Sequence, residues 1–414
     1  MGIPLLKGPV LSRPPRIALV TSGFEVGGGV PTVARWLRDS LRSVAGYTVD
    51  VHDLATSSRD PYSRRLVEPK SWVRRSLRNR SGGEDSVVHW GANAVEIEAM
   101  RYRPRRELTK ALQSYDLIQV VAGSPAWASP VIGTGVPTVL LAATTVTWER
   151  RWHLAQQTGV GRIWRRGMTL LTARVERRTL RNVGALLVLN SAMLEHLLSG
   201  GHECVIKALP GVDTTLFSPP VKGWSRGDYI LSVCRLNDVR KGLERMIRAY
   251  AIMFQLDESV PPLVLAGRGQ LPAHLLSLVT NLGLLSRVTV RSNVGTRELS
   301  ELYRGASVFL QTSYEEGLGM SVLEAMACGL PVVSTDTAGA RETVVNGVTG
   351  WLVPQDSDPQ VSALVADRVM EVLRGNGAAM GGRARQRCET AFSSEVALRR
   401  FTDVYEDLLP RREA

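Results

Sequence analysis

Short apolar runs alternate with helical patterns along most of the chain, starting at Arg16. In the first half, the runs of strand length cover residues 17–21, 48–54, 117–121, 138–142 and 186–190. Strands with few polar residues are typical of parallel sheets, because helices cover both faces of such sheets. The pattern therefore predicts an α/β domain in the first half of the chain.

A second, cleaner series of the same kind begins near Tyr229. Its predicted strands cover residues 229–234, 263–266, 288–290, 308–311 and 331–334, and its predicted helices include residues 242–254, 297–304 and 321–327. Strands that alternate with helices in this way predict a second doubly wound, Rossmann-like unit. The fold class is thus α/β, with two doubly wound domains expected to face a cleft between them.

Turn-forming residues suggest where the domains begin and end. We predict a loose leader at 1–15, a first domain at 16–210, a linker at 211–227 and a second domain at 228–393. A final helix in 394–414 is expected to cross back to the first domain. Residues 55–85 are rich in Arg and Ser and lack periodicity, which predicts an exposed loop excursion on the acceptor side.

Composition narrows the class of protein. The 414 residues are 44% hydrophobic and 22% charged, as in ordinary soluble domains, and the four cysteines form no CxxC pair. We therefore expect neither a disulfide framework nor a zinc site, and a cytoplasmic location. The net charge of +12 comes mainly from arginine, which favours an anionic ligand, a lipid surface or nucleic acid. No nucleic-acid-reading motif supports the last of these.

A glycine-rich loop follows the first predicted strand. Residues 23–32 include Gly27, Gly28 and Gly29 and place Pro31 near the expected start of a helix. Glycines let backbone approach a ligand, and a helix N-terminus favours phosphate. The loop lacks the GxGxxG and P-loop patterns, so a purely structural turn is an equally good interpretation.

The most specific motif covers residues 313–334. Glu316 follows a predicted buried strand, and Glu324 lies in the next predicted helix. The backbone N–H groups around that helix start would face an anion or sugar oxygens, and the two carboxylates would accept hydroxyl hydrogen bonds. These N–H groups belong to Gly317, Leu318, Gly319, Met320 and neighbouring Ser321.

This motif resembles the signature of the retaining nucleotide-sugar transferases of glycosyltransferase family 4, which have the two-Rossmann-domain GT-B fold. The resemblance continues through residues 339–342 and 346–353, and includes residues 211–219 and 230–242. It implies hexosyl transfer from a nucleoside diphosphate sugar to a hydroxyl acceptor, by front-face displacement. It covers 186–409 well and 16–54 loosely.

The resemblance also implies roles for individual residues. Arg235 and Lys241 are similar to the cationic pair that grips the donor diphosphate, in place of a metal ion. Glu324 is similar to the residue that holds the ribose, and Glu316 to the one that touches the donor sugar. The segments Gly267-Arg268-Gly269 and Asn293-Val294 resemble the edge that binds the base.

Two positions depart from the family pattern. Family members often carry a histidine after the strand predicted at 138–142, where this chain has Ala143-Thr144-Thr145. His153 could approach from a loop, although a surface or packing role is more common for such a histidine. Cys234 stands where the family usually has glycine.

Asp356 and Asp358 form the only Asp-x-Asp pair in the chain, a spacing that binds divalent metal in another transferase fold. They precede Pro359 and a helical pattern, so helix capping is the better interpretation. No metal or other cofactor is expected.

Residues 148–181 combine three tryptophans with nine arginines. Trp164, Met168, Leu171 and Val175 form one helical stripe flanked by arginines. Packing of this stripe on the first domain is the common outcome, and contact with an anionic membrane, peripheral on its inner face, is the alternative.

Other functions remain open at this point. A sugar-nucleotide epimerase or phosphorylase would share the fold, and a catalytically silent relative that binds a partner would share part of the motif.

Overall fold

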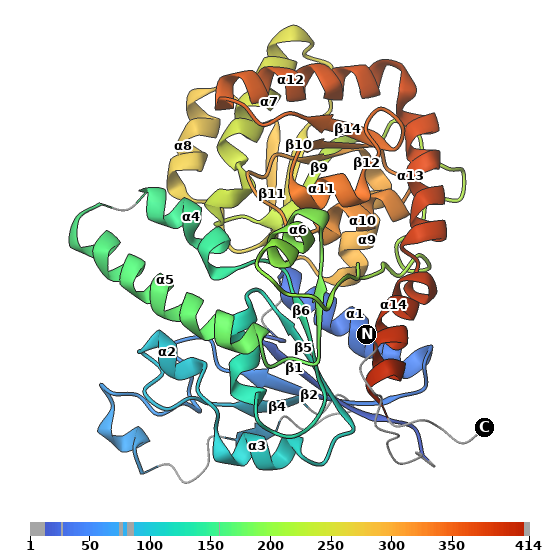
Figure 1. Ribbon diagram of the computed structural model, residues 1–414. Coiled ribbons are helices and arrows are strands. Elements are labelled where there is room, and N and C mark those ends of the chain that lie inside the picture. The colour runs from blue at the N-terminus through green and yellow to red at the C-terminus, as the bar shows by residue number, and fades with distance from the viewer. Residues whose placement is uncertain (1–12, 26–27, 74–77, 81–86, 157, 410–414) are drawn as a thin grey trace. The chain divides into compact units, whose positions relative to one another are not determined.

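The computed structural model describes residues 13–25, 28–73, 78–80, 87–156 and 158–409, which form two compact units (Figure 1). The first unit runs to Pro210 and includes the chain again from Leu398, and the second covers Gly211–Ala397. Segment 211–227, predicted as a linker, therefore lies within the second unit. Its Phe217 is 6% exposed, and its ring centroid lies 5.8 Å from that of Tyr303.

The first unit is built on an eight-stranded sheet in the order β3-β4-β2-β1-β5-β6-β7-β8. All neighbouring strands are parallel except β3 and β4. The strands are β1 (Arg16–Ser22), β2 (Thr48–Leu54), β3 (Arg78–Arg80), β4 (Val87–Trp90), β5 (Leu117–Ala122), β6 (Thr138–Ala142), β7 (Ala185–Val188) and β8 (Val205–Lys207). The predicted α/β class is confirmed, and β3, β4 and β8 are strands that the pattern did not predict.

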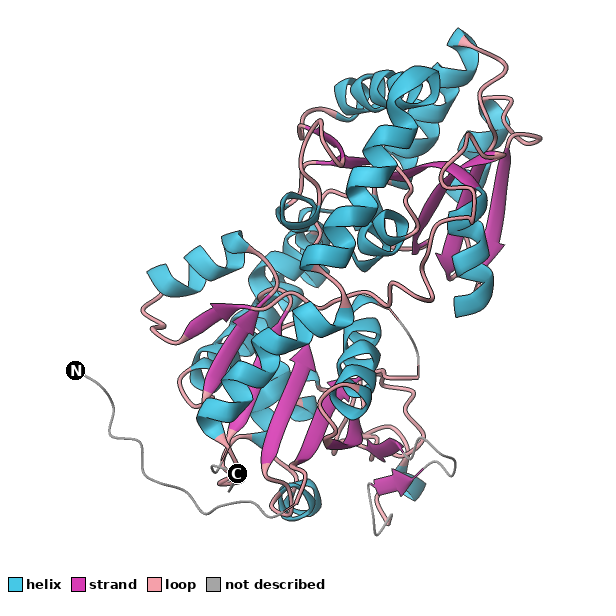
Figure 2. Cartoon of the chain, turned by 90° about the vertical axis from the view of Figure 1, so that its right-hand side faces the viewer, coloured by secondary structure: helices cyan, strands magenta, loops and turns pink. Residues whose placement is uncertain are grey.

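Helices cover the sheets of both units (Figure 2). In the first unit they are α1 (Gly29–Ser43), α2 (Glu98–Arg101), α3 (Arg106–Leu112), α4 (Val146–Gln156), α5 (Gly159–Leu180) and α6 (Ser191–Ser199), with 3₁₀ turns η1 (Pro69–Ser71) and η2 (Pro125–Val131). Among the described residues, no helix is long and apolar enough to cross a membrane.

Most described residues of segment 55–85 are exposed, as predicted, but three polar ones are not. Asp60, Ser63 and Ser71 are all buried there. Asp60 accepts a hydrogen bond from His89 Nε2 (2.9 Å), and Ser63 Oγ accepts one from the Ala92 backbone N–H (2.8 Å). The expectation of an exposed loop is wrong at these positions, because Asp60 and Ser63 bond to β4 and the residues after it, and the Ser71 hydroxyl donates to the Glu68 carbonyl within the segment (2.7 Å). Residues 74–77 and 81–86 lie outside the described residues.

His89 joins two aspartates at the edge of the first sheet. Its Nδ1 lies 2.8 Å from Asp53 Oδ2, and its Nε2 lies 2.9 Å from Asp60 Oδ1. The other oxygen of Asp53 accepts a hydrogen bond from the Phe24 backbone N–H (2.9 Å), in the loop after β1. Burial alone would lower the pKa of His89, but the hydrogen bonds and charges of the two aspartates raise it to about 9.

We expect the free energy of unfolding to decrease as the pH rises through about 9. The imidazolium is favoured in the folded chain, so its contribution is complete below the unfolded pKa of about 6.5 and is lost above the folded value. A shift of this size corresponds to about 3 kcal/mol. Urea unfolding as a function of pH measures it. The His89→Gln variant should be less stable at neutral pH and should show a flatter profile, and an unchanged profile would contradict the assignment.

The second unit has a six-stranded sheet in the order β11-β10-β9-β12-β13-β14, and every neighbouring pair is parallel. The strands are β9 (Tyr229–Arg235), β10 (Leu263–Arg268), β11 (Val288–Ser292), β12 (Ala306–Gln311), β13 (Val332–Thr335) and β14 (Gly350–Val353). The chain moves outward from β9 to β11, then returns to the other side of β9 with β12. This order reverses between β9 and β12, which is where doubly wound sheets bind ligands.

The helices of the second unit begin with α7 (Leu243–Leu256), which follows the 3₁₀ turn η3 (Val239–Lys241). The others are α8 (Ala273–Asn281), α9 (Thr296–Gly305), α10 (Met320–Ala327), α11 (Ala338–Thr343), α12 (Asp358–Glu371), the π-helical segment η4 (Val372–Asn376), α13 (Gly377–Ala391) and α14 (Ser394–Leu408). The division between the units falls inside α14, whose residues from Leu398 belong to the first unit. In the first unit, Tyr405 of α14 donates a hydrogen bond to Gln119 Oε1 (2.6 Å).

Candidate functional site

The carboxyl edge of the second sheet collects most of the residues that the sequence singled out. Arg235 ends β9, Arg268 ends β10, and Asn293 follows β11 directly. Glu316 lies in the loop after β12. Because carboxyl ends of parallel strands share one edge, residues far apart in the chain lie along a single border, with Lys241 and Glu316 at the reversal point.

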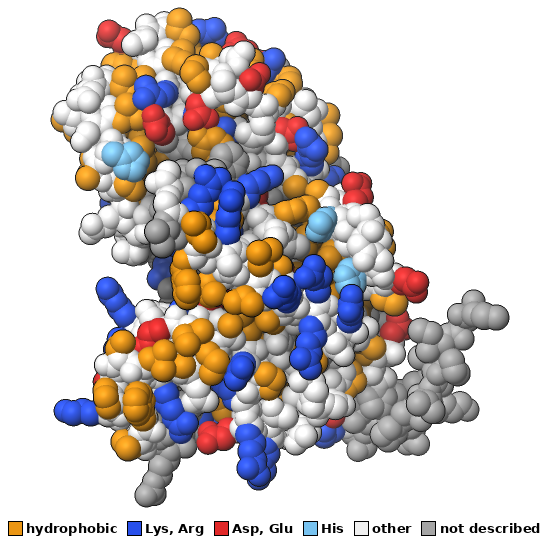
Figure 3. Space-filling model, turned by 60° about the vertical axis from the view of Figure 1, so that its left-hand side comes forward, with side chains coloured by type: hydrophobic (Ala, Val, Ile, Leu, Met, Phe, Trp, Pro, Cys, Tyr) orange, Lys and Arg blue, Asp and Glu red, His pale blue; other side chains and the backbone are white. Residues whose placement is uncertain are grey.

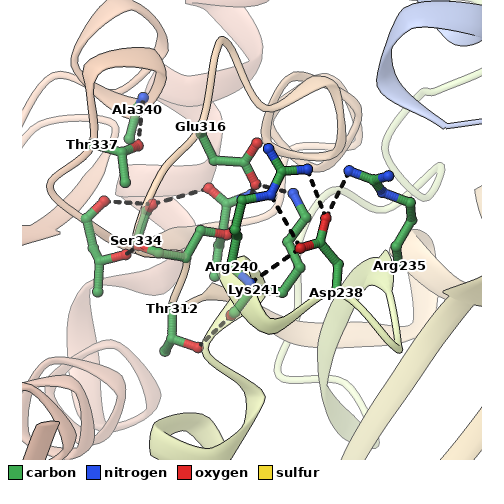
Figure 4. A network of polar contacts seen from close by, with 12 residues as sticks. Arg235, Asp238, Arg240, Lys241, Thr312, Glu316, Ser334, Thr337 and Ala340 are labelled. Carbon is green, nitrogen blue, oxygen red and sulfur yellow. Dashed lines mark hydrogen bonds and ion pairs between the residues drawn. The ribbon is translucent and has the colours of Figure 1, made fainter. Parts of the chain in front are cut away.

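Lys241 and Glu316 form an ion pair at this border (Figure 4). Their side chains are only 15% and 11% exposed. The same carboxylate oxygen, Glu316 Oε1, accepts hydrogen bonds from Ser313 Oγ (2.9 Å) and Gln311 Nε2 (3.3 Å). Glu316 is therefore held by three donors at one oxygen, and its position is coupled to that of the lysine.

Asp238 holds two arginines beside this pair. Its Oδ2 lies 2.7 Å from Arg235 and 2.9 Å from Arg240, and Figure 4 shows both guanidinium groups directed at it. Burial would raise the pKa of Asp238, but the hydrogen bond from Arg240 and both positive charges lower it to about 2. Asp238 therefore stays ionised and orients Arg235, whose side chain is 48% exposed. The exposed guanidinium keeps N–H groups available for an anion.

Glu324 lies in α10 and is only 8% exposed. Its Oε2 accepts a hydrogen bond from the Tyr303 hydroxyl (2.7 Å). Burial raises the pKa of Glu324 to about 7, although the tyrosine opposes this shift. Near neutral pH this carboxyl can therefore either accept or donate a hydrogen bond.

The loop before α10 brings backbone close to backbone. Gly319 has φ +83° and precedes Met320, the first residue of α10. Gly339 lies against the same loop, and a Cβ there would stand 2.6 Å from Leu318 Cα. Its N–H donates to the Glu316 carbonyl oxygen (3.0 Å). These contacts place the segment of Gly317, Leu318, Gly319, Met320 and Ser321 at the start of α10, beside Glu316.

The other side of the border is formed by Gly267 and Asn293. Gly267 has φ +137°, and a Cβ would stand 1.8 Å from the Cys234 carbonyl oxygen. The Asn293 backbone N–H donates to the Gly267 carbonyl (2.6 Å). Arg268 and Asn293 are exposed, and Val294 is half-buried. At Cys234, where the family usually has glycine, burial raises the pKa of the thiol to about 12, so the sulfur stays neutral.

The remaining candidates lie elsewhere. Gly28 and Gly29 belong to the first unit, where Gly28 has φ +115° and α1 begins at Gly29. A Cβ at either residue would meet no atom of the described residues within 4 Å. At Gly28 the backbone angle, rather than close packing, therefore favours glycine. His153 lies in α4, and its side chain is outside the described residues.

The Asp-x-Asp pair does not cap α12 as predicted. Ser357 precedes the helix, its side chain makes no capping hydrogen bond, and Asp358 is the first helical residue. Asp358 instead accepts a hydrogen bond from the Tyr314 hydroxyl (2.7 Å) and lies 3.6 Å from Arg245. Among the described residues, no group of three or more His, Cys, Asp and Glu side chains could hold a metal ion.

Sequence reasoning missed Arg245, which supports the site from behind. This arginine is fully buried in α7, and its Nε donates to the Thr312 carbonyl at the end of β12 (2.7 Å). Its guanidinium carbon lies 3.9 Å from the ring centroid of Tyr314. Thr312 Oγ1 in turn donates to the Gly242 carbonyl (3.0 Å). Arg245 thus links the loops that carry Lys241 and Glu316. An arginine at an apolar helical position was the available signal.

The second unit has recognisable relatives. Residues 219–387 match the family model described as "Glycosyl transferases group 1". The second unit belongs to the group 1 glycosyl transferases. The match covers both strands and loops of the border described above, including Arg235, Lys241, Glu316 and Glu324.

Two curated relatives of this group 1 unit are similar over part of their length. A "D-inositol 3-phosphate glycosyltransferase" of Streptosporangium roseum is 30% identical over 212 residues, which are 47% of this chain and 48% of the relative. A "GDP-mannose-dependent alpha-(1-6)-phosphatidylinositol monomannoside mannosyltransferase" of Mycolicibacterium smegmatis is 32% identical over 210 residues, 47% of this chain and 51% of the relative. The chain thus spans about half the length of these relatives.

Solved structures resemble the whole chain in fold. The sucrose-phosphate synthase of Thermosynechococcus elongatus has a TM-score of 0.69 at 21% identity, covering 95% of this chain and 99% of that one. HepE of Anabaena, solved in complex with UDP-glucose, has a TM-score of 0.68 at 16% identity, covering 95% and 100%. The first and second units of this chain together therefore have the GT-B fold.

Proposed function

We propose that the chain is a retaining glycosyltransferase that moves a hexosyl unit from a nucleoside diphosphate sugar to a hydroxyl acceptor. The observation that carries the proposal is the grouping of Arg235, Lys241 and Glu316 along one sheet border with the start of α10, the helix that contains Glu324. Two cations and a helix N-terminus suit a diphosphate, and two carboxylates suit sugar hydroxyls.

In this proposal, Arg235 and Lys241 bind the diphosphate. Negative charge grows on the leaving phosphate as the bond to the sugar breaks, so cations at this position stabilise the transition state more than the ground state. Asp238 orients Arg235 through a 2.7 Å ion pair. The Glu316 partner of Lys241 sits next to the diphosphate, where it can touch the donor sugar.

In the proposed reaction, the sugar is transferred by front-face displacement. The bond between the anomeric carbon and the phosphate oxygen breaks, and a bond to the acceptor oxygen forms on the same face of the sugar. The acceptor proton passes to the departing phosphate oxygen, so the anomeric configuration is retained. This route needs no pair of carboxylates at glycosidase spacing.

Product analysis tests the proposal. The purified chain is offered UDP-, GDP- and ADP-sugars with hydroxyl acceptors, and products are identified by mass spectrometry and anomeric NMR. Release of nucleoside diphosphate with an α-linked product from an α-linked donor supports it. An epimerised donor, a sugar phosphate, or an inverted linkage would contradict it.

We further expect turnover without a divalent metal. Arg235 and Lys241 supply the positive charge that a metal ion supplies in other transferases. Assays with excess EDTA should keep most of the activity of the untreated enzyme. If activity is lost with EDTA and returns with Mn²⁺ or Mg²⁺, the two cations do not replace a metal, and Asp356 and Asp358 become candidate ligands.

A further inference from the structure

Helix α5 packs on the first unit through polar residues more than through its apolar stripe. Its buried residues are the polar Thr169, Thr172, Glu176 and Thr179. Four of its large apolar side chains are exposed, namely Ile163 (72%), Trp164 (68%), Leu170 (66%) and Leu171 (40%), whereas the stripe residues Met168 and Val175 are half-buried. Packing of the stripe on the first domain is therefore wrong for Trp164 and Leu171.

The polar groups on the buried face of α5 are satisfied by hydrogen bonds within the chain. Thr169, Thr172 and Thr179 each donate a hydroxyl hydrogen bond to the carbonyl four residues earlier, at 2.8–2.9 Å. Glu176 accepts a hydrogen bond from the Val146 N–H at the start of α4 (2.9 Å), and burial raises its pKa to about 7. These bonds satisfy the buried hydroxyl and carboxyl groups, so the inward face can be polar while apolar side chains lie outward.

The outward face is also strongly basic. Helix α5 contains six arginines, and its one acidic residue is the buried Glu176. At 3.6 residues per turn, four arginines share half of the circumference with the exposed apolar residues. They are Arg166, Arg174, Arg177 and Arg178, all of them exposed. In the described part of the chain, none of the four forms an ion pair with a carboxylate.

We propose that this outward face of α5 docks onto an anionic lipid surface. Its apolar side chains and its arginines, which have no carboxylate partner among the described residues, match the two layers of a membrane interface. Trp, Ile and Leu would enter the acyl boundary while guanidinium groups contact lipid phosphates. Figure 3 brings this side of the first unit forward and shows hydrophobic and basic side chains intermingled there, with few acidic ones.

Lipid fits the face better than nucleic acid does. Phosphate binding alone uses arginines, and it leaves four large apolar side chains in water without a role. The inference also stands apart from the proposed transferase activity, since it uses no residue of the second unit. A chain that binds lipid but no nucleotide, or the reverse, would separate the two.

Vesicle co-sedimentation tests the docking surface. The full chain should sediment with vesicles of phosphatidylcholine mixed with phosphatidylglycerol, should stay in solution with phosphatidylcholine alone, and should be released by salt. The Arg177→Gln/Arg178→Gln variant should partition about tenfold or more weakly, because each arginine contributes at the lipid surface. Leu170→Ser should also weaken partitioning.

Two matched controls separate this face from general charge and hydrophobicity. Arg399→Gln/Arg400→Gln changes an exposed arginine pair on α14, and Leu256→Ser changes a leucine that is 69% exposed, close to the 66% of Leu170. Both controls should sediment like the parent chain. Equal losses in controls and test variants would overturn the proposal, as would no sedimentation with the anionic vesicles.

Nucleic acid or a second copy of the chain, if either bound this face instead, would give a different experimental result. Tight binding of a DNA or RNA duplex lost in Arg177→Gln/Arg178→Gln, without vesicle binding, would assign the face to nucleic acid. A dimer that dissociates in Leu170→Ser, without vesicle binding, would assign it to a second copy of the chain. Either result overturns docking on lipid. Melting temperatures and nucleoside diphosphate binding should stay unchanged in every variant, since all the changed side chains are exposed.

Discussion

Arg235→Ala and Lys241→Ala are each expected to lower kcat by about 10²–10³, or ~3–4 kcal/mol in transition-state stabilisation. The reason is that both cations oppose charge that develops only as the sugar leaves the diphosphate. Steady-state kinetics with the preferred donor measures the effect. Near-normal turnover in both variants would refute the proposal that Arg235 and Lys241 bind the donor diphosphate.

The control for this experiment is Arg248→Ala. Arg248 on α7 matches Arg235 in exposure (47% against 48%) and in having one carboxylate partner, Glu244 at 2.8 Å. It lies on a helix rather than at the sheet border, so turnover should not change. Lys241→Ala leaves the Glu316 carboxylate without its cation, and melting curves of this variant and of Lys241→Ala/Glu316→Gln show whether lost stability contributes.

Glu324→Gln and Glu316→Gln are expected to affect different steps. If Glu324 holds the ribose, its amide variant weakens binding of the bare nucleoside diphosphate and of the whole donor alike. Glu316→Gln should spare the bare nucleotide and depress kcat, because a contact with the sugar strengthens as the ring gains positive charge. Calorimetry with nucleoside diphosphate, together with kinetics, separates the two patterns.

A structural role for either glutamate would give another pattern. Glu324 is tied to Tyr303 and Glu316 to Lys241, so a purely structural role predicts a lower melting temperature with unchanged turnover per folded molecule. Equal loss of nucleotide affinity in both variants would also count against the division of roles.

Five of the six strands of the second sheet could be predicted from sequence, because they are mostly apolar runs bounded by glycine, proline or polar residues, whereas β14 (Gly350–Val353) was not predicted. The predicted strands also placed the candidate site residues together, because residues that follow parallel strands lie along one edge of the sheet. The four-residue strand β4 was not predicted, because it follows an Arg- and Ser-rich stretch and is too short to show periodicity. Its His89 was missed with it.

Polar side chains account for the remaining differences. The orientation of α5 could not be predicted from its apolar stripe, because threonines satisfy their own hydroxyls within the helix and so tolerate burial. The ion pairs of Arg235 with Asp238 and of Lys241 with Glu316 join residues whose contacts depend on loop geometry. Their residue types were visible in the sequence, whereas their pairing required the fold.

A crystal structure of the chain with the nucleoside diphosphate that binds it most tightly would test the donor site itself. The account predicts the diphosphate within hydrogen-bond reach of Arg235, Lys241 and the first N–H groups of α10, with the ribose hydroxyls on Glu324. A nucleotide bound away from the carboxyl border of the second sheet, or at this border with Arg235 and Lys241 still turned only toward Asp238 and Glu316, would contradict it.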